Sequence, residues 1–438
     1  MRRFLYPLLP LWLFLASCGT SPAPASAPPE LDAEQPPNVL LIVADDLGWA
    51  DLNSYGNPLV QSPHLDELAR SGVQFMHAYA AAPVGPPARA ALQTGIYPTF
   101  ANRGQLSTRH ETIGEMARHA GLTTAHIGRW AVGDESGSPA TRGYDHVFAA
   151  AATHPDDYYH PFFDDDPPAD LLAETGPGDY LTDKLTDHTL GLIEGWRDTS
   201  WLISLNYYTP HVPLKPRKDQ VVAYRQLIDS THWRKFPTPA YAAMISVLDE
   251  NIGRIVAALD RSGQLDNTLL LFTSDNGGLH LPATGKMARH TPPTDNGILR
   301  GGKGTLYEGG IRVPFILHFP AYATMRSASL EPVIGVDVFP TIAAALSQDY
   351  RAQNPDGRSL LPLLHGERMP ERTLFWSSPH DGPEGPATAV RHGDLKLYRS
   401  DGQDSVTWFN LREYPDESLR STERGALLEA LREWEGNR

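Results

Sequence analysis

Residues 38–44 read Asn-Val-Leu-Leu-Ile-Val-Ala, an apolar run that ends at the acidic pair Asp45 and Asp46. Its hydrophobic residues are continuous rather than alternating, which predicts a strand buried on both faces, as in a parallel sheet covered by helices. Two similar runs occur at 201–205 and 268–273, and both also end in polar residues. Open α/β sheets bind their ligands at the carboxyl ends of the strands, so we expect a site where these runs end.

The rest of the chain supports an α/β fold with a mostly parallel sheet sandwiched by helices. Residues 241–260 carry apolar side chains at helical spacing, and Gly263 follows as a helix-ending residue. Strands that alternate with helices are typical of this class. Beyond the main domain, which we place at 38–350, the chain becomes rich in Pro and Gly. Short strand candidates and a last helix at 421–434 predict a smaller C-terminal α+β subdomain over 351–438.

Composition excludes several classes of protein. The 438 residues are 41% hydrophobic, which is enough to bury a large core. The 37 Lys and Arg against 52 Asp and Glu give a formal charge of −15, which argues against a nucleic-acid partner. Cys18 is the single cysteine, so the chain has neither an internal disulfide nor a zinc site built from several thiolates.

The N-terminus predicts export and a lipid anchor. Two arginines precede an apolar run at 4–15, which is too short to span the roughly 30 Å hydrocarbon core and is typical of a secretory signal. The run ends in Leu-Ala-Ser-Cys-Gly, which resembles the bacterial lipobox, so we expect a signal peptide at 1–18 and lipidation of Cys18. An ordinary cleaved signal is the alternative. Residues 19–37 form a Pro/Ala/Ser-rich tether, which predicts a lipid-anchored protein of the bacterial envelope, on its periplasmic or surface face.

Two polar pairs at strand ends are candidate metal ligands. Asp45 and Asp46 follow the first strand, and Asp275 and Asn276 follow the strand at 268–273. They offer only carboxylate and amide oxygens, which suit Ca²⁺ or Mg²⁺ better than a soft metal. The alternative for either pair is that Asp and Asn merely form turns or cap helices.

Four segments together resemble the sulfatase family. They are found in family order at 38–49, 207–214, 272–278 and 301–314. The resemblance implies the alkaline-phosphatase-like α/β fold. It also implies one divalent cation, usually calcium and alternatively magnesium, held by Asp45, Asp46, Asp275 and Asn276.

The family's defining motif is altered in this chain. In the family a cysteine or serine, then any residue, precedes Pro-Ser-Arg, and a helix ends in Thr-Gly; the first residue is oxidised to formylglycine, the nucleophile. Here Arg89, Thr94 and Gly95 match without gaps, which puts Gly85 at the nucleophile position and Ala88 at that of the serine. Glycine has no side chain to oxidise, so formylglycine chemistry is excluded at this position.

A second motif departs from the family in the same direction. The family carries Gly-Lys-Trp-His-Leu-Gly, where this chain has Arg129 and Ala131 in place of the lysine and the histidine. Arg129 still offers a cationic fork to an anion, whereas Ala131 offers nothing. His211 and Lys303, which in the family contact the sulfate and the leaving oxygen, are present. The alternative for His211 is a proline-flanked histidine that only packs a loop. The alternative for Lys303 is a lysine of a Gly-rich loop without a role in binding.

These residues favour a protein that binds sulfate esters, above all sulfated glycans, with impaired or absent hydrolysis. An active sulfuric or phosphoric ester hydrolase that uses metal-bound water, with His211 as the acid, is the first alternative. A ligand-free scaffold is the second. The loop at 153–168 mixes aromatic and acidic residues, and packed aromatics are favoured there over a platform for sugar rings.

Overall fold

The structure is a computed structural model that describes residues 36–98, 105–132, 137–231, 237–281, 291–325, 327–350, 353–378, 385–400, 406–418 and 426–436. Cys18, the predicted signal peptide and all but the last two residues of the predicted tether lie outside these ranges. Within them, the helices are all too short or too polar to cross a membrane.

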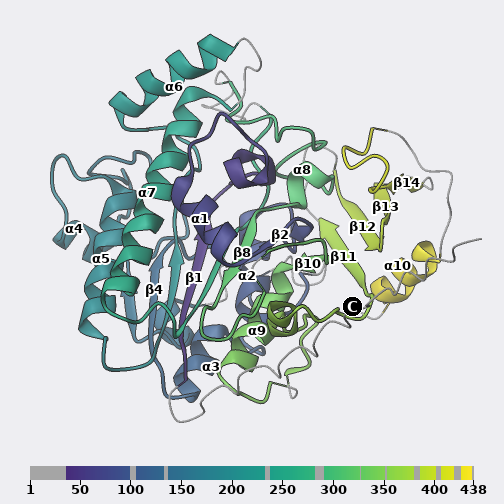
Figure 1. Ribbon diagram of the computed structural model, residues 1–438, viewed down its shortest axis with the longest axis horizontal. Helices are drawn as coiled ribbons and strands as arrows, with labels where there is room; N and C mark the ends of the chain where they lie inside the picture. Colours follow the sequence, from purple (N-terminus) through teal and green to yellow (C-terminus); the bar gives the residue numbers. More distant parts are fainter. Residues whose placement is uncertain are drawn as a thin grey trace, which may run out of the picture.

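A large mixed sheet forms the centre of the molecule (Figure 1). Its eight strands run in the order β5-β4-β6-β1-β7-β8-β2-β9, and only the pairs made by β8 are antiparallel. The strands are β1 (Asn38–Ala44), β2 (Val73–Phe75), β4 (Thr123–Gly128), β5 (His146–Phe148), β6 (Trp201–Asn206), β7 (Thr268–Ser274), β8 (Phe315–His318) and β9 (Ser327–Ser329). The three strands expected from apolar runs are therefore confirmed as its centre, β6-β1-β7.

Helices cover both faces of this sheet, as the continuous apolar runs predict. In β1, Leu40 and Ile42 pack with helices α1, α5 and α7, while Val39 and Leu41 pack with α2, α3 and α9. Alternate residues of the same strand therefore point to opposite faces of the sheet, and both sets are buried. The helices are α1 (Pro63–Ser71), α2 (Gly85–Thr94), α3 (Ile113–His119), α4 (Ala169–Ala173), α5 (Leu181–Gly195), α6 (Lys218–Thr231), α7 (Pro239–Arg261), α8 (Glu308–Ile311), α9 (Val338–Ala345) and α10 (Leu427–Gly436).

A separate antiparallel sheet lies at the C-terminal end of the chain, beside the main body (Figure 1). Its strands are β11 (Thr373–Ser378), β12 (Ala387–His392), β13 (Leu395–Ser400) and β14 (Val406–Asn410), and α10 packs on it. The predicted α+β subdomain is thus present, and among the described residues α10 corresponds to the helix expected at 421–434. The segment before this sheet, 360–364, packs with the main core, so the domain boundary near 350 stays a prediction. A short parallel pair, β3 (Ala78–Tyr79) and β10 (Val333–Ile334), completes the strands.

Candidate metal and anion site

The two acidic strand ends meet at one edge of the sheet. Strands β1 and β7 are parallel neighbours whose last residues, Ala44 and Ser274, are paired, so the residues that follow emerge side by side. Carboxylate oxygens of Asp45, Asp46 and Asp275 lie within 4.8 Å of one another, and all three residues are buried. The backbone N–H of Asp46 donates to Asp275 Oδ1 at 3.1 Å. The expected convergence of these carboxylates is therefore seen.

The donor atoms of this cluster fit a hard divalent cation. Asn276 joins it by donating its amide N–H to Asp46 Oδ1 at 2.8 Å. Asp45 Oδ1 and Asn276 Oδ1 are buried and have no hydrogen-bond partner among the described residues. Buried oxygens without partners are costly, and a cation held by oxygen ligands would satisfy both. Burial and the charge of Asp45 raise the pKa of Asp275 to about 6, which fits a crowded anionic site.

Two buried arginines balance the carboxylates. Arg89, on α2, donates from Nε to Asp275 Oδ2 at 3.0 Å and from Nη1 to Asn206 Oδ1 at 2.8 Å. Arg129, directly after β4, contacts Asp45 through Nη1. Burial alone would raise the pKa of Asp45, but Arg129, His211 and Arg89 hold it below its usual range. The arginines therefore reduce the repulsion among the carboxylates and leave a cationic edge for an anion.

Lys303 and His211 approach the same cluster from two loops. Lys303 Nζ lies 2.7 Å from Asp46 Oδ1 and 2.8 Å from Oδ2. His211 Nε2 lies 3.1 Å from Lys303 Nζ and 3.4 Å from Asp46 Oδ2. Burial lowers the pKa of His211. The residues expected to contact an ester anion thus lie together with the candidate metal ligands.

Gly85 is the first residue of α2 and faces the cluster without a side chain. A Cβ built on it would lie 2.7 Å from Asp275 Oδ2 and 3.7 Å from Arg129 Nη1. The helix was expected near Pro87; it begins at Gly85, with prolines in the first turn, where a missing N–H costs nothing. The N-terminal, positive end of its helix dipole lies beside the cluster, which favours a bound anion.

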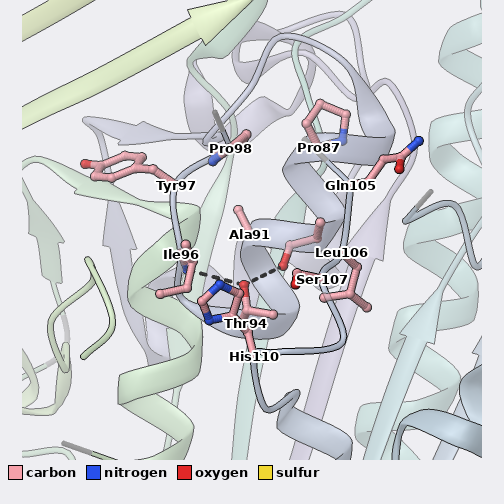
Figure 2. Close-up of a pocket in the computed structure, with 11 residues that line it drawn as sticks. Pro87, Ala91, Thr94, Ile96, Tyr97, Pro98, Gln105, Leu106, Ser107 and His110 are labelled. Atoms are coloured by element: carbon pink, nitrogen blue, oxygen red, sulfur yellow. Dashed lines mark hydrogen bonds between the residues drawn. The ribbon is translucent and has the colours of Figure 1, made fainter. Parts of the chain in front are cut away.

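The other end of α2 matches the predicted Thr-Gly ending. Thr94 Oγ1 donates to Ala90 O at 2.9 Å and accepts from the N–H of Ile96 at 3.3 Å, as Figure 2 shows. Gly95 follows in the left-handed region, at φ 72°, where glycine is favoured. The cavity in Figure 2, between this helix and the segment with His110, measures about 10 Å³ and is lined by none of the predicted site residues. It has room for about one water molecule.

One residue of the site was missed by the sequence analysis. His154, in the loop after β5, stacks its imidazole on that of His211, with ring centroids 3.4 Å apart. No motif or spacing in the sequence marks it, because it lies in an irregular loop whose aromatic and acidic residues indicate packing rather than a binding site. The favoured packed-aromatic interpretation is confirmed for Tyr158, Phe162 and Phe163, which are buried in the main core.

Comparison with known proteins assigns the family. The sulfatase family profile matches residues 37–348, which is most of the chain. The chain belongs to the sulfatase family. Mouse steryl-sulfatase is 30% identical over 436 residues, covering 79% of this chain and 67% of that protein. The N-acetylgalactosamine-6-O-sulfatase of Bacteroides thetaiotaomicron is 29% identical, covering 84% of this chain and 83% of its relative.

Solved structures agree with the fold of this sulfatase-family protein. The crystal structure of Ps i-CgsB superposes with a TM-score of 0.78 at 27% identity and covers 92% of both chains. A second structure of Ps i-CgsB, in complex with k-i-k-neocarrahexaose, gives a TM-score of 0.77. The alkaline-phosphatase-like fold expected from the resemblance is confirmed. In this family member the acidic cluster of Asp45, Asp46 and Asp275 is a site able to hold a metal ion.

Proposed function

We propose that this sulfatase-family protein binds sulfate esters, above all sulfated glycans, at a site with one divalent cation, and hydrolyses them slowly or not at all. Gly85 carries the proposal. Its α-carbon faces the carboxylates and Arg129, so a side chain there would point into the site, and the chain supplies none. The anion-binding side chains around this position are present, which is the combination expected of a binding site without its nucleophile.

The side chains that would bind the cation and the ester anion already lie close together in the structure. We assign the cation to Asp45, Asp46, Asp275 and Asn276. Calcium is the expected ion, with magnesium as the alternative, because every ligand atom that these side chains offer is a carboxylate or amide oxygen. Such a cation would attract the ester anion and draw electron density from its oxygens. Arg89, Arg129, Lys303 and His211 would bind the remaining oxygens of the anion, and the N-terminus of α2 adds its dipole.

Loss of the nucleophile would remove most of the rate. Without a side chain at Gly85, covalent attack on the ester has no group to begin it. Removing a nucleophile typically costs several orders of magnitude in kcat. His211 remains in place to donate a proton to a leaving oxygen, but position 131 holds only a methyl group. Binding and hydrolysis are therefore expected to separate in this protein.

The substrate class and the location are inferences from different sources. Two relatives support a carbohydrate ligand, one named as an N-acetylgalactosamine-6-O-sulfatase and one crystallised with k-i-k-neocarrahexaose. The net charge of −15 argues against a nucleic-acid partner. We place the protein at the bacterial envelope, exported and lipid-anchored at Cys18, on the strength of the lipobox-like sequence.

One assay on the purified protein tests the proposal. A panel of sulfated oligosaccharides, with the unsulfated sugars as matched controls, is titrated with and without a chelator, and sulfate release is measured in the same samples. We expect binding that needs sulfate and weakens with the chelator, with kcat far below the roughly 1 s⁻¹ usual for enzymes. Turnover at usual rates would favour the alternative of an active hydrolase. Absence of binding to every sulfated probe would favour the scaffold.

A further inference from the structure

His154 lies inside the anion site although no motif points to it. Its Nε2 atom is 3.9 Å from Asp45 Oδ2, on the same carboxylate that Arg129 contacts. Nε2 is buried and has no hydrogen-bond partner within the described part of the chain. A buried nitrogen without a partner, directed at a charged cluster, requires an explanation.

The loop that carries His154 is held against the loop that carries His211. Tyr208 Oη donates to Ala149 O at 2.9 Å and accepts from the N–H of Ala151 at 3.1 Å. Tyr158 Oη donates to His211 O at 3.0 Å. Both tyrosines are buried, so these bonds fix the two loops relative to each other in a low-dielectric setting. The stack of the two imidazoles is therefore built into the fold.

The same loop runs beside the segment whose histidine this chain lacks. The N–H of Trp130 donates to Ala151 O at 2.9 Å, which joins the residue before Ala131 to the loop of His154. Ala131 is buried and carries no polar group. His154 thus brings an imidazole to the site from the neighbouring loop, whereas residue 131 contributes none.

We propose that His154 is a further substrate-contacting residue of this site, whose Nε2 donates a hydrogen bond to an oxygen of the bound ester anion. This rests on the proposed function, because it needs an anion between the arginines and Lys303. The alternative role for His154 is to bind a metal ion together with His211 and Asp45, because the ligand atoms of the three residues lie within 4.8 Å of one another. The two rings are within 13° of parallel, so their nitrogen lone pairs run side by side rather than converge on one ion.

The first test observes the imidazole directly in the unmodified protein. Protein labelled with ¹⁵N-histidine is titrated with calcium alone, then with inorganic sulfate, then with p-nitrophenyl sulfate, and the ring nitrogens are followed by NMR. We expect the Nε2 resonance of His154 to move with both anions, while His160, on the same loop, does not respond. A second sample is titrated with zinc. A His154 resonance that does not move with either anion would overturn the proposal, and one that moves with zinc instead would assign His154 as a metal ligand.

The second test measures affinity. His154→Ala is expected to weaken binding of p-nitrophenyl sulfate by about 10- to 100-fold, as loss of a hydrogen bond to a charged group does. His154→Gln, which keeps a donor, should recover part of this loss, and the control His160→Asn should bind like wild type. Equal affinity in wild type and His154→Ala would refute the role of His154 alone. Failure of wild type to bind any sulfated probe would instead refute both this inference and the proposed function.

Discussion

The α-carbon of Gly85 lies so close to the Asp275 carboxylate that a Cβ on residue 85 would come within 2.7 Å of Asp275 Oδ2. That oxygen is held in place, because Arg89 Nε donates to it at 3.0 Å. A side chain at residue 85 and the present position of Asp275 therefore exclude each other. Restoring a nucleophile would require the carboxylate and its arginine partner to move together.

The first prediction is that Gly85→Cys alone does not restore a sulfatase. In a host with the formylglycine-generating enzyme, we expect little or no hydrolysis of p-nitrophenyl sulfate, because Ala88 and Ala131 still replace the serine and histidine of the family motifs. The added side chain also displaces Asp275. Gly191→Cys, on an exposed face of α5 where a Cβ meets nothing within 4 Å, is the matched control for expression. A kcat of about 1 s⁻¹ or more for Gly85→Cys would contradict the prediction.

The triple change Gly85→Cys, Ala88→Ser, Ala131→His should do markedly better than the single one. The three positions act as a unit, so their effects on kcat should exceed the product of the single effects. Ala88 packs among Ala80, Ala82 and Val313, so the new hydroxyl enters a small apolar cluster, and some stability should be lost. Hydrolysis rates and Tm are measured on the same preparations. Equal rates for the single and triple variants would show that the lesion lies elsewhere.

The second prediction concerns the cation. Wild type is expected to retain about one calcium per chain after gel filtration, and Asp45→Asn combined with Asp275→Asn to retain none. The asparagines keep the shape of the carboxylates and remove their charge. Added calcium should also raise the Tm of wild type, because a ligand that binds only the folded state stabilises it. Asp51→Asn, at another buried aspartate outside the cluster, serves as the control. Equal metal content in wild type and the double variant would refute the assignment.

The sequence was sufficient to predict the sheet centre and the acidic cluster, since both follow from local patterns. Asp45 and Asp275 end buried parallel strands, and the carboxyl ends of adjacent parallel strands meet at one edge. His154 could not be found in this way. It comes from an irregular loop, and its place depends on tyrosine hydrogen bonds between loops about 50 residues apart in the chain. The partner of Arg89 on β6, Asn206, likewise depends on tertiary packing.

The third prediction tests the anchor. Cys18→Ser, expressed in a bacterial envelope, should move the protein from the membrane fraction to the soluble fraction. The several acyl chains of a lipoprotein anchor hold a protein stably at a membrane, whereas a single chain binds only marginally. Immunoblots of fractionated cells measure the distribution. Wild type found equally in the soluble fraction would support an ordinary cleaved signal instead.

The fourth prediction is a pH dependence that belongs to one buried group. Burial raises the pKa of Asp51 to about 6, although Thr294 and Tyr241 donate hydrogen bonds to it. A raised pKa in the folded state means that folding favours the protonated acid. The stabilisation is therefore complete below the ordinary pKa of 3.8 and is lost as the pH rises through about 6. Asp51→Asn mimics the protonated form, so the difference in free energy of unfolding between variant and wild type should grow in favour of the variant from about pH 4 to about pH 7, by up to about 3 kcal/mol. Denaturant unfolding of both proteins across this pH range measures it. A difference that does not change with pH would contradict it.

The last prediction concerns the contact between the C-terminal sheet and the loop of Lys303. Lys396 on β13 is fully buried, and its Nζ lies 2.9 Å from a carboxylate oxygen of Glu308 and 2.9 Å from one of Glu417. Glu308 begins α8, a few residues after Lys303. Lys396→Met leaves two buried carboxylates facing each other without their cation, and loss of one partner of a buried ion pair typically costs about 3–5 kcal/mol.

We therefore expect Lys396→Met to lower the Tm by several degrees, and Lys215→Met, which breaks a half-exposed pair with Asp157, to leave it almost unchanged. Adding Glu308→Gln to Lys396→Met should recover part of the loss, because it removes one of the two buried carboxylate charges that Lys396 balances. Loss of the ion pairs should also loosen the loop of Lys303. At a temperature where the single variant is still fully folded, it should therefore bind sulfate esters more weakly than wild type. If Lys396→Met melts and binds like wild type, then the C-terminal sheet does not support this side of the site.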